Sequence, residues 1–116
     1  MSNFVGNNCR IIGKSLTATT NTTVFTAGAS DYDQVVGVRV ANITALDATI
    51  SVRWFDSSAN ASYCIIFQHT VPANGAVWFP LEAFAVDPSD EIRAQAGTAN
   101  ALDVILSLAS VPGRSG

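Results

Sequence analysis

The chain has 116 residues, of which 48% are apolar and 13% are charged, and its formal net charge is −3. This length suits one domain with one modest core, and the apolar content argues against a disordered chain. The basic residues are scattered, which argues against a nucleic-acid surface, and no apolar run approaches the ~18 residues of a membrane helix.

The charged fraction is about half of the ~25% that is usual for soluble domains. A chain with so few charges and so many apolar residues is expected to have part of its surface covered by partner proteins or by further copies of itself.

Alternation of apolar and polar residues with a period of two, interrupted by turn-forming residues, predicts short β-strands through most of the chain. In chain order the predicted strands centre on residues 24–26, 36–41, 49–55, 63–68, 76–81, 91–96 and 102–109. A short helical turn is conceivable only at residues 81–85. The sequence therefore predicts an all-β fold, a single antiparallel β-sandwich of seven to eight strands with jelly-roll or immunoglobulin-like connections.

The two ends of the chain differ from this pattern. Residues 1–14 are rich in Asn and Gly and predict an extended N-terminal arm that becomes ordered mainly on binding a partner. Residues 15–111 would form the sandwich, and residues 112–116 a flexible tail. The N-terminus lacks the basic start and apolar core of a signal peptide, so we expect the protein to stay in the cytoplasm until assembly.

Cys9 and Cys64 lie far apart in the sequence. Without a secretion signal we expect two reduced thiols, with Cys64 packed as a small apolar side chain. A Cys9–Cys64 bridge that ties the arm to the sandwich is the alternative.

Large apolar residues at outward-facing strand positions suggest a contact surface. Either the arm, a loop or a bulge covers them, or they contact another subunit. The scarcity of charge favours a subunit contact, to which the apolar residues of the arm would add. The predicted interface residues are Phe4, Ile11, Ile12, Phe55, Trp78 and Ile105.

Three arginines, Arg39, Arg53 and Arg93, also fall at outward positions. Glu91 and Asp103 are plausible cross-strand neighbours for them, and such exposed pairs contribute little to stability. Solvated decoration of the sheet is the simpler interpretation of these arginines, and a partner-binding site is the other.

No arrangement of residues indicates catalysis. His69 is the only histidine, and no nucleophile elbow accompanies it, so we expect a surface histidine. One His and two distant Cys lack the spacing of a zinc site. The carboxylates of residues 31–33 and 87–91 suit turns better than a calcium ion. We therefore predict no enzyme activity, no catalytic residue, no cofactor and no metal.

Several strand and turn segments follow one another in an order shared with a known class of proteins. They are Thr23-Val24-Phe25-Thr26-Ala27, Gly37-Val38-Arg39-Val40-Ala41-Asn42-Ile43-Thr44, Ala48-Thr49-Ile50-Ser51-Val52, Val71-Pro72-Ala73-Asn74-Gly75, Asp90-Glu91-Ile92-Arg93-Ala94-Gln95-Ala96 and Leu102-Asp103-Val104-Ile105-Leu106-Ser107. In this order the chain resembles small virion structural proteins of tailed bacteriophages. It departs from them at Asp90-Glu91, where the family pattern has a Gly-Asp step.

The resemblance implies a non-catalytic component of the virion, made in the host cytoplasm. The preferred role is a capsid decoration (cement) protein that binds the outer capsid surface and stabilises it, and a neck- or tail-associated protein is the alternative. The implied partners are the major capsid protein, or neck and tail proteins, together with further copies of the chain, with a trimer favoured. Neither nucleic acid nor membrane is expected as a partner.

A carbohydrate-binding module for host recognition is the competing hypothesis from another class. Such modules present exposed aromatic residues as a platform. Trp78, Tyr32 and Tyr63 are the candidates here, and their spacing does not bring them together. A small hydrolase is a more remote alternative.

Overall fold

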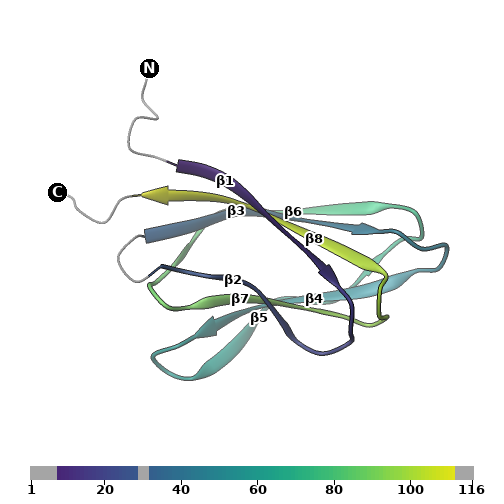
Figure 1. Ribbon diagram of the computed structural model, residues 1–116, viewed down its shortest axis with the longest axis horizontal. Helices are drawn as coiled ribbons and strands as arrows, with labels where there is room; N and C mark the ends of the chain where they lie inside the picture. The colour runs from purple at the N-terminus through teal and green to yellow at the C-terminus, as the bar shows by residue number, and fades with distance from the viewer. Residues whose placement is uncertain (1–7, 29–31, 112–116) are drawn as a thin grey trace, which may run out of the picture.

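Eight strands arranged as two facing sheets make up the computed structural model, which describes residues 8–28 and 32–111 (Figure 1). One sheet has the strand order β1-β8-β3-β6 and the other β2-β7-β4-β5, and every pairing is antiparallel. The strands are β1 (Asn8–Leu16), β2 (Thr22–Thr26), β3 (Tyr32–Asn42), β4 (Ala48–Asp56), β5 (Ala61–Val71), β6 (Ala76–Val86), β7 (Glu91–Ala96) and β8 (Leu102–Val111).

The chain changes sheet at every connection except the one between β4 and β5. Two four-stranded sheets joined in this way form a jelly roll, in which Greek-key crossings interleave the strands. An immunoglobulin-like sandwich instead keeps its first two strands in one sheet. The all-β sandwich is thus confirmed, and of the two connectivities left open by the sequence the chain adopts the jelly roll.

The core lies between the two sheets and consists of the apolar phases of the strands. On β7 and β8 the predicted alternation holds without a break, because every second residue of 92–96 and of 102–108 is buried. Ile50 and Val52 of β4 and Val38 and Val40 of β3 face them from the neighbouring strands and are fully buried. These inner positions fix which side chains must point outward on each strand.

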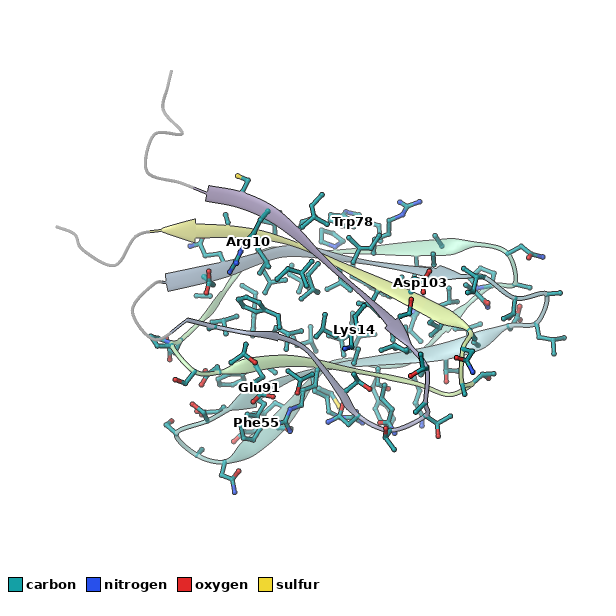
Figure 2. The ribbon with its side chains drawn as sticks, viewed as in Figure 1. Arg10, Lys14, Phe55, Trp78, Glu91 and Asp103 are labelled. Atoms are coloured by element: carbon teal, nitrogen blue, oxygen red, sulfur yellow. The ribbon has the colours of Figure 1, made fainter. Side chains whose placement is uncertain are left out.

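The predicted N-terminal arm needs correction. Residues 8–14 belong to β1, which pairs with β8 along its whole length, from Asn8 opposite Ser110 to Leu16 opposite Leu102. The apolar–polar alternation of β1 cannot be seen in the sequence because charged residues, Arg10 and Lys14, occupy two of its inward positions (Figure 2). Both lie on an edge strand, where a long side chain can keep its charged end near water. Residues 1–7 and 112–116 lie outside the described residues.

A bulge interrupts β3 between Val35 and Gly37, both in its pairing with β6 and in its pairing with β8. The sequence predicts that Val36 faces inward with Val38 and Val40. Instead Val35 is buried and Val36 is 41% exposed, because one extra residue reverses the phase of the strand. Residues 81–85, where a helical turn was conceivable, continue β6 past the bulge, with Phe84 opposite Val35.

Two buried polar side chains hold the ends of the sandwich together. Asn42, at the end of β3, donates to the carbonyl oxygens of Leu46 and Val71 (2.8 and 3.0 Å) and accepts from the backbone and hydroxyl of Thr44. At the other end, Asp90 accepts from the Trp54 indole and from the backbone and hydroxyl of Ser57, each at 2.9 Å. Both residues are nearly inaccessible to solvent.

Candidate functional site

The outer face of the β1-β8-β3-β6 sheet gathers residues from four strands into two adjacent rows. One row runs Gly13, Ile105, Arg39, Trp78, and the next runs Ile11, Ser107, Gly37, Pro80. Residues directly opposite one another on paired strands point to the same side of a sheet. We call these eight residues the apolar face, because Ile11, Ile105, Trp78 and Pro80 occupy its large positions.

Trp78 lies flat on the sheet because Gly37 leaves room for it. A Cβ atom added at Gly37 would fall 2.2 Å from Cη2 and 2.4 Å from Cζ2 of the indole ring. The ring therefore covers Gly37 while Trp78 remains 48% exposed on the side turned away from the second sheet (Figure 2). Ile11, at the β1 edge of the same face, is 72% exposed.

The apolar face carries little charge. Arg39 is the one charged member of the two rows, and among the described residues no ion pair involves it. In the next row along these strands, Asp103 accepts a 2.7 Å hydrogen bond from the Ser15 hydroxyl. A broad apolar patch with a single positive charge suits contact with a protein surface that is apolar and mildly acidic.

The edge strands are poor templates for adding a further strand. Arg10 and Lys14 point inward from β1, β2 is short and bulged, and β6 carries Pro80. On β5 the register shifts twice against β4, and Gln68 has a left-handed backbone with φ of 48°. Inward charges, proline and bulges are the devices that protect sheet edges from pairing with other chains. Side chains of a sheet face are therefore the better candidates for assembly contacts.

The structure brings together three of the six predicted interface residues, Ile11, Ile105 and Trp78. Ile12 points inward and packs against the core. Phe55 lies on the outer side of the other sheet, where the guanidinium of Arg93 stacks over its ring at 3.9 Å (Figure 2). Phe4 lies outside the described residues. The interface role of all six stays a prediction.

Sequence reasoning missed several members of this surface and several exposed apolar residues elsewhere. Gly37 and Pro80 complete the apolar face, and only the register of β3 against β6 reveals them. Exposed large apolar side chains that the sequence analysis did not single out also occur at Val36, Ile43, Leu46 and Phe67. The bulge explains Val36, and loop positions explain Ile43 and Leu46.

Both cysteines are free and exposed, so the expectation that Cys64 packs in the interior is wrong. Cys9 lies on β1 and Cys64 on β5, which are edge strands of different sheets. His69 is exposed on β5 and contacts the ring of Phe79 edge-on at 5.0 Å.

The candidate aromatic platform is not assembled. Trp78 lies on one sheet, whereas Tyr63 stacks on Trp54 at the other, with ring centroids 5.4 Å apart. The side chain of Tyr32 lies outside the described residues. The exposed aromatic residues therefore do not provide the shared surface that a carbohydrate-binding module of that kind needs.

The carboxylates near the β6–β7 turn bind protein groups. Burial alone would raise the pKa of Asp90, but the hydrogen bonds from the Ser57 backbone, the Trp54 indole and the Ser57 hydroxyl together lower it below its ordinary value. The pKa of Glu91 is lowered by the hydrogen bond from Arg93 (2.8 Å) and by that from Thr23 (2.8 Å). Within residues 8–28 and 32–111, no group of three or more His, Cys, Asp or Glu side chains is arranged to hold a metal ion.

The described part of the chain contains no helix long and apolar enough to cross a membrane.

Comparison with known proteins finds likeness at the level of the fold. No protein-family model and no curated protein sequence matches the chain. A chain from the disulfide-linked pili of Bacillus endospore appendages superposes with a TM-score of 0.56 at 14% identity, covering 94% of this chain and 88% of that one.

Two phage capsids contain similar chains. For the acid-stable capsid of Helicobacter pylori bacteriophage KHP30 the TM-score is 0.56 at 11% identity, covering 92% of this chain and 89% of that one. For the capsid of cyanophage Pam1 the TM-score is 0.51 at 15% identity, covering 97% and 90%. The chain thus shares a sandwich fold that occurs in phage capsids and in a bacterial pilus.

Proposed function

We propose that this chain is a virion structural protein, and specifically a capsid decoration protein that binds the outer capsid surface through the apolar face. The observation that carries the proposal is the apolar face itself. It places Ile11, Ile105 and Trp78 on one side of one sheet with a single charge among them. Exposed apolar surface of this kind is a mark of protein contact sites.

The lengths of the similar chains support a small capsid component over the shell-forming subunit. In the two phage capsids, the fraction of each chain that superposes is nearly the same for both partners, so the matched chains are close to this one in length. In the infectious bursal disease virus structure, by contrast, the match covers 96% of this chain but 32% of the viral chain. A short chain that folds as one jelly roll is suited to sit on a shell built by other proteins.

The protected sheet edges support attachment by side chains of a face. Burying the apolar face against the shell would remove Ile11 and Trp78 from water, at roughly 25 cal/mol for each Å² of apolar surface buried. If the apolar face also formed the trimer, less of it would remain for the shell, so we expect the trimer contacts to use side chains outside the apolar face. A neck- or tail-associated protein would use the same chemistry at a few sites on the particle.

Copy number separates decoration from the neck and tail. We would quantify the chain against the major capsid protein in purified particles of the virus that encodes it, by mass spectrometry with isotope-labelled peptides. Decoration predicts a simple fraction of the number of capsid subunits. A handful of copies would contradict decoration and favour the neck or tail, and absence from particles would overturn the virion assignment.

Rebinding to stripped particles tests the apolar face. The variants Ile11→Asp and Ile105→Asp place a carboxylate on this face, and each should weaken attachment at least tenfold, which corresponds to about 1.4 kcal/mol. Phe67→Asp is the matched control, because Phe67 is 62% exposed on β5 of the other sheet. Equal occupancy by all three folded variants would show that another surface binds the particle.

A further inference from the structure

We propose that the outer side of the β2-β7-β4-β5 sheet carries a binding site for a sugar that bears one carboxylate, with Arg53 as its anion-binding group. An open pocket of about 220 Å³ lies on this side, and Arg53 shares its lining with hydroxyl and amide side chains from three strands and the β1–β2 loop. The site goes beyond the decoration role. It faces away from the apolar face, so it stays open when that face is covered.

Charge is the first reason to expect an anion here. Arg53 lies directly opposite Arg93 on the neighbouring strand, and like charges in that position repel. Arg93 is compensated by Glu91, whose Oε1 lies 2.8 Å from its Nε. Arg53 has no ion pair among the described residues, and its guanidinium donates a 2.8 Å hydrogen bond to the neutral side-chain amide of Gln95. An acidic ligand would supply the negative charge that compensates Arg53.

Arg53 is held in place in advance of any ligand. The Gln95 amide accepts from Nη1 of Arg53 and donates through Nε2 to the carbonyl oxygen of Thr19 at 3.0 Å. Both ends of this amide are thus occupied, which fixes its orientation and that of the guanidinium. Such preorganisation reduces the loss of side-chain freedom on binding. Gln95 is a positioning residue in this site.

Backbone strain is the second reason, and it is independent of charge. Gln68 lines the same pocket and has a φ of 48°, a conformation that a residue with a side chain rarely adopts. A register shift in the facing strand accompanies it, and the buried Ser51 hydroxyl accepts from the Gln68 backbone N–H at 2.9 Å. Strained residues held by their surroundings cluster at binding sites. Gln68 thus brings a strained backbone to the pocket that Arg53 also lines.

The donors and acceptors indicate the class of ligand. A single guanidinium matches a single negative charge, as on a carboxylate, and its planar fork can bind both carboxylate oxygens. A phosphate carries more charge than one arginine compensates. The hydroxyl of Thr49 and the amide of Gln68 suit the hydroxyl groups of a sugar ring. The volume is below the ~300–1,000 Å³ of drug-sized ligand pockets, so one sugar unit fits it better than an extended chain.

Titration of the full chain with glucuronate, followed by amide resonances in two-dimensional NMR spectra, tests the proposal. We expect saturable shifts at Gln68, Gln95 and Gly97 in the millimolar range. Glucose, acetate and inorganic phosphate are the comparison probes, and each should bind at least tenfold more weakly. If glucose bound as tightly as glucuronate, Arg53 would not be an anion-binding group. If acetate bound as tightly, the site would not recognise the sugar, and tighter binding of phosphate would overturn the carboxylate assignment.

Variants locate the site. Arg53→Gln should weaken glucuronate binding at least tenfold, whereas Arg39→Gln, which removes the same charge from the opposite sheet, should leave it unchanged. Gln68→Gly keeps the left-handed backbone while removing the side-chain amide, so it should fold and still bind more weakly. Unchanged affinity in both pocket variants, or no saturation by the folded wild-type chain, would refute the site. Particle attachment should be the same for Arg53→Gln as for wild type, so failure here leaves the decoration proposal to its own test.

Discussion

Asp90 links the β6–β7 turn to the end of β4, and its replacement by alanine should be among the most costly single changes in the chain. Its carboxylate accepts from the Ser57 backbone, the Ser57 hydroxyl and the Trp54 indole. Hydrogen bonds to a charged group contribute roughly 1.5–3 kcal/mol each, and a buried donor left unpaired costs about 1–3 kcal/mol. Because water can reach the half-buried Trp54, we expect Asp90→Ala to lower the free energy of unfolding by about 3 kcal/mol at pH 7.

The pH dependence gives this prediction a sign. The folded state lowers the pKa of Asp90 from its ordinary value of 3.8, so the contribution is present above that value. It is lost as pH falls through the lower folded pKa. The difference in stability between wild type and Asp90→Ala should therefore be constant from pH 7 to about pH 5 and shrink below pH 4.

Urea unfolding, followed by tryptophan fluorescence and by circular dichroism, measures both effects. Asp90→Asn is the matched variant. It keeps one acceptor oxygen but places an amide donor near the Ser57 or Trp54 donors, so its loss should be intermediate and nearly independent of pH. A loss below about 1 kcal/mol for Asp90→Ala, or a difference that does not change between pH 7 and pH 3, would refute this account of the carboxylate.

Three further predictions follow from the packing. Gly37→Ala should displace the indole of Trp78 and lower the free energy of unfolding by about 1–2 kcal/mol, because roughly half of the ring loses its contact with the sheet. Urea unfolding measures this loss, and a red-shifted emission from Trp78 in a Trp54→Phe background would show the displaced ring. Unchanged emission would contradict the prediction. Asn42→Ala should lower the free energy of unfolding, measured in urea, by about 2–3 kcal/mol, since it leaves the carbonyl oxygens of Leu46 and Val71 and the Thr44 N–H without their partner. A loss below about 1 kcal/mol would show that water replaces the Asn42 side chain as that partner. Deletion of residues 1–7 should leave cooperative thermal unfolding intact. Deletion of residues 1–14 removes most of β1 and should abolish cooperative unfolding. A folded 15–116 fragment would show that β1 is not needed for the fold.

The strands that the sequence predicts best are those buried on one side without interruption. On β7, Ile92, Ala94 and Ala96 alternate with longer polar residues, and the pattern carries over to the structure unchanged. β1 could not be recognised, because Arg10 and Lys14 take two of its inward positions and imitate a polar loop. The phase of β3 could not be predicted either, since nothing in the sequence around Val36 announces the bulge.

The candidate surfaces depend on register, which sequence patterns do not specify. Ile105 and Trp78 could each be recognised as outward apolar residues on their own strands. That they flank Arg39 in one row follows only from the pairing of β8 and β6 with β3. The Arg53 pocket could not be predicted from the sequence for another reason. It needs the left-handed backbone of Gln68 and the approach of the β1–β2 loop, both of which are products of the assembled fold.

The pairing of the first strand with the last has a consequence for engineering the chain. Asn8 lies opposite Ser110, so the two ends of the described sandwich meet at one corner of the β1-β8-β3-β6 sheet (Figure 1). A peptide or protein joined directly at Asn8 or at Val111 would start from that corner, beside the apolar face and on the sheet that does not carry the pocket. A short linker could also join the two ends, with the chain reopened in the exposed turn between β4 and β5, which would move a fused cargo to the opposite sheet without cutting a strand.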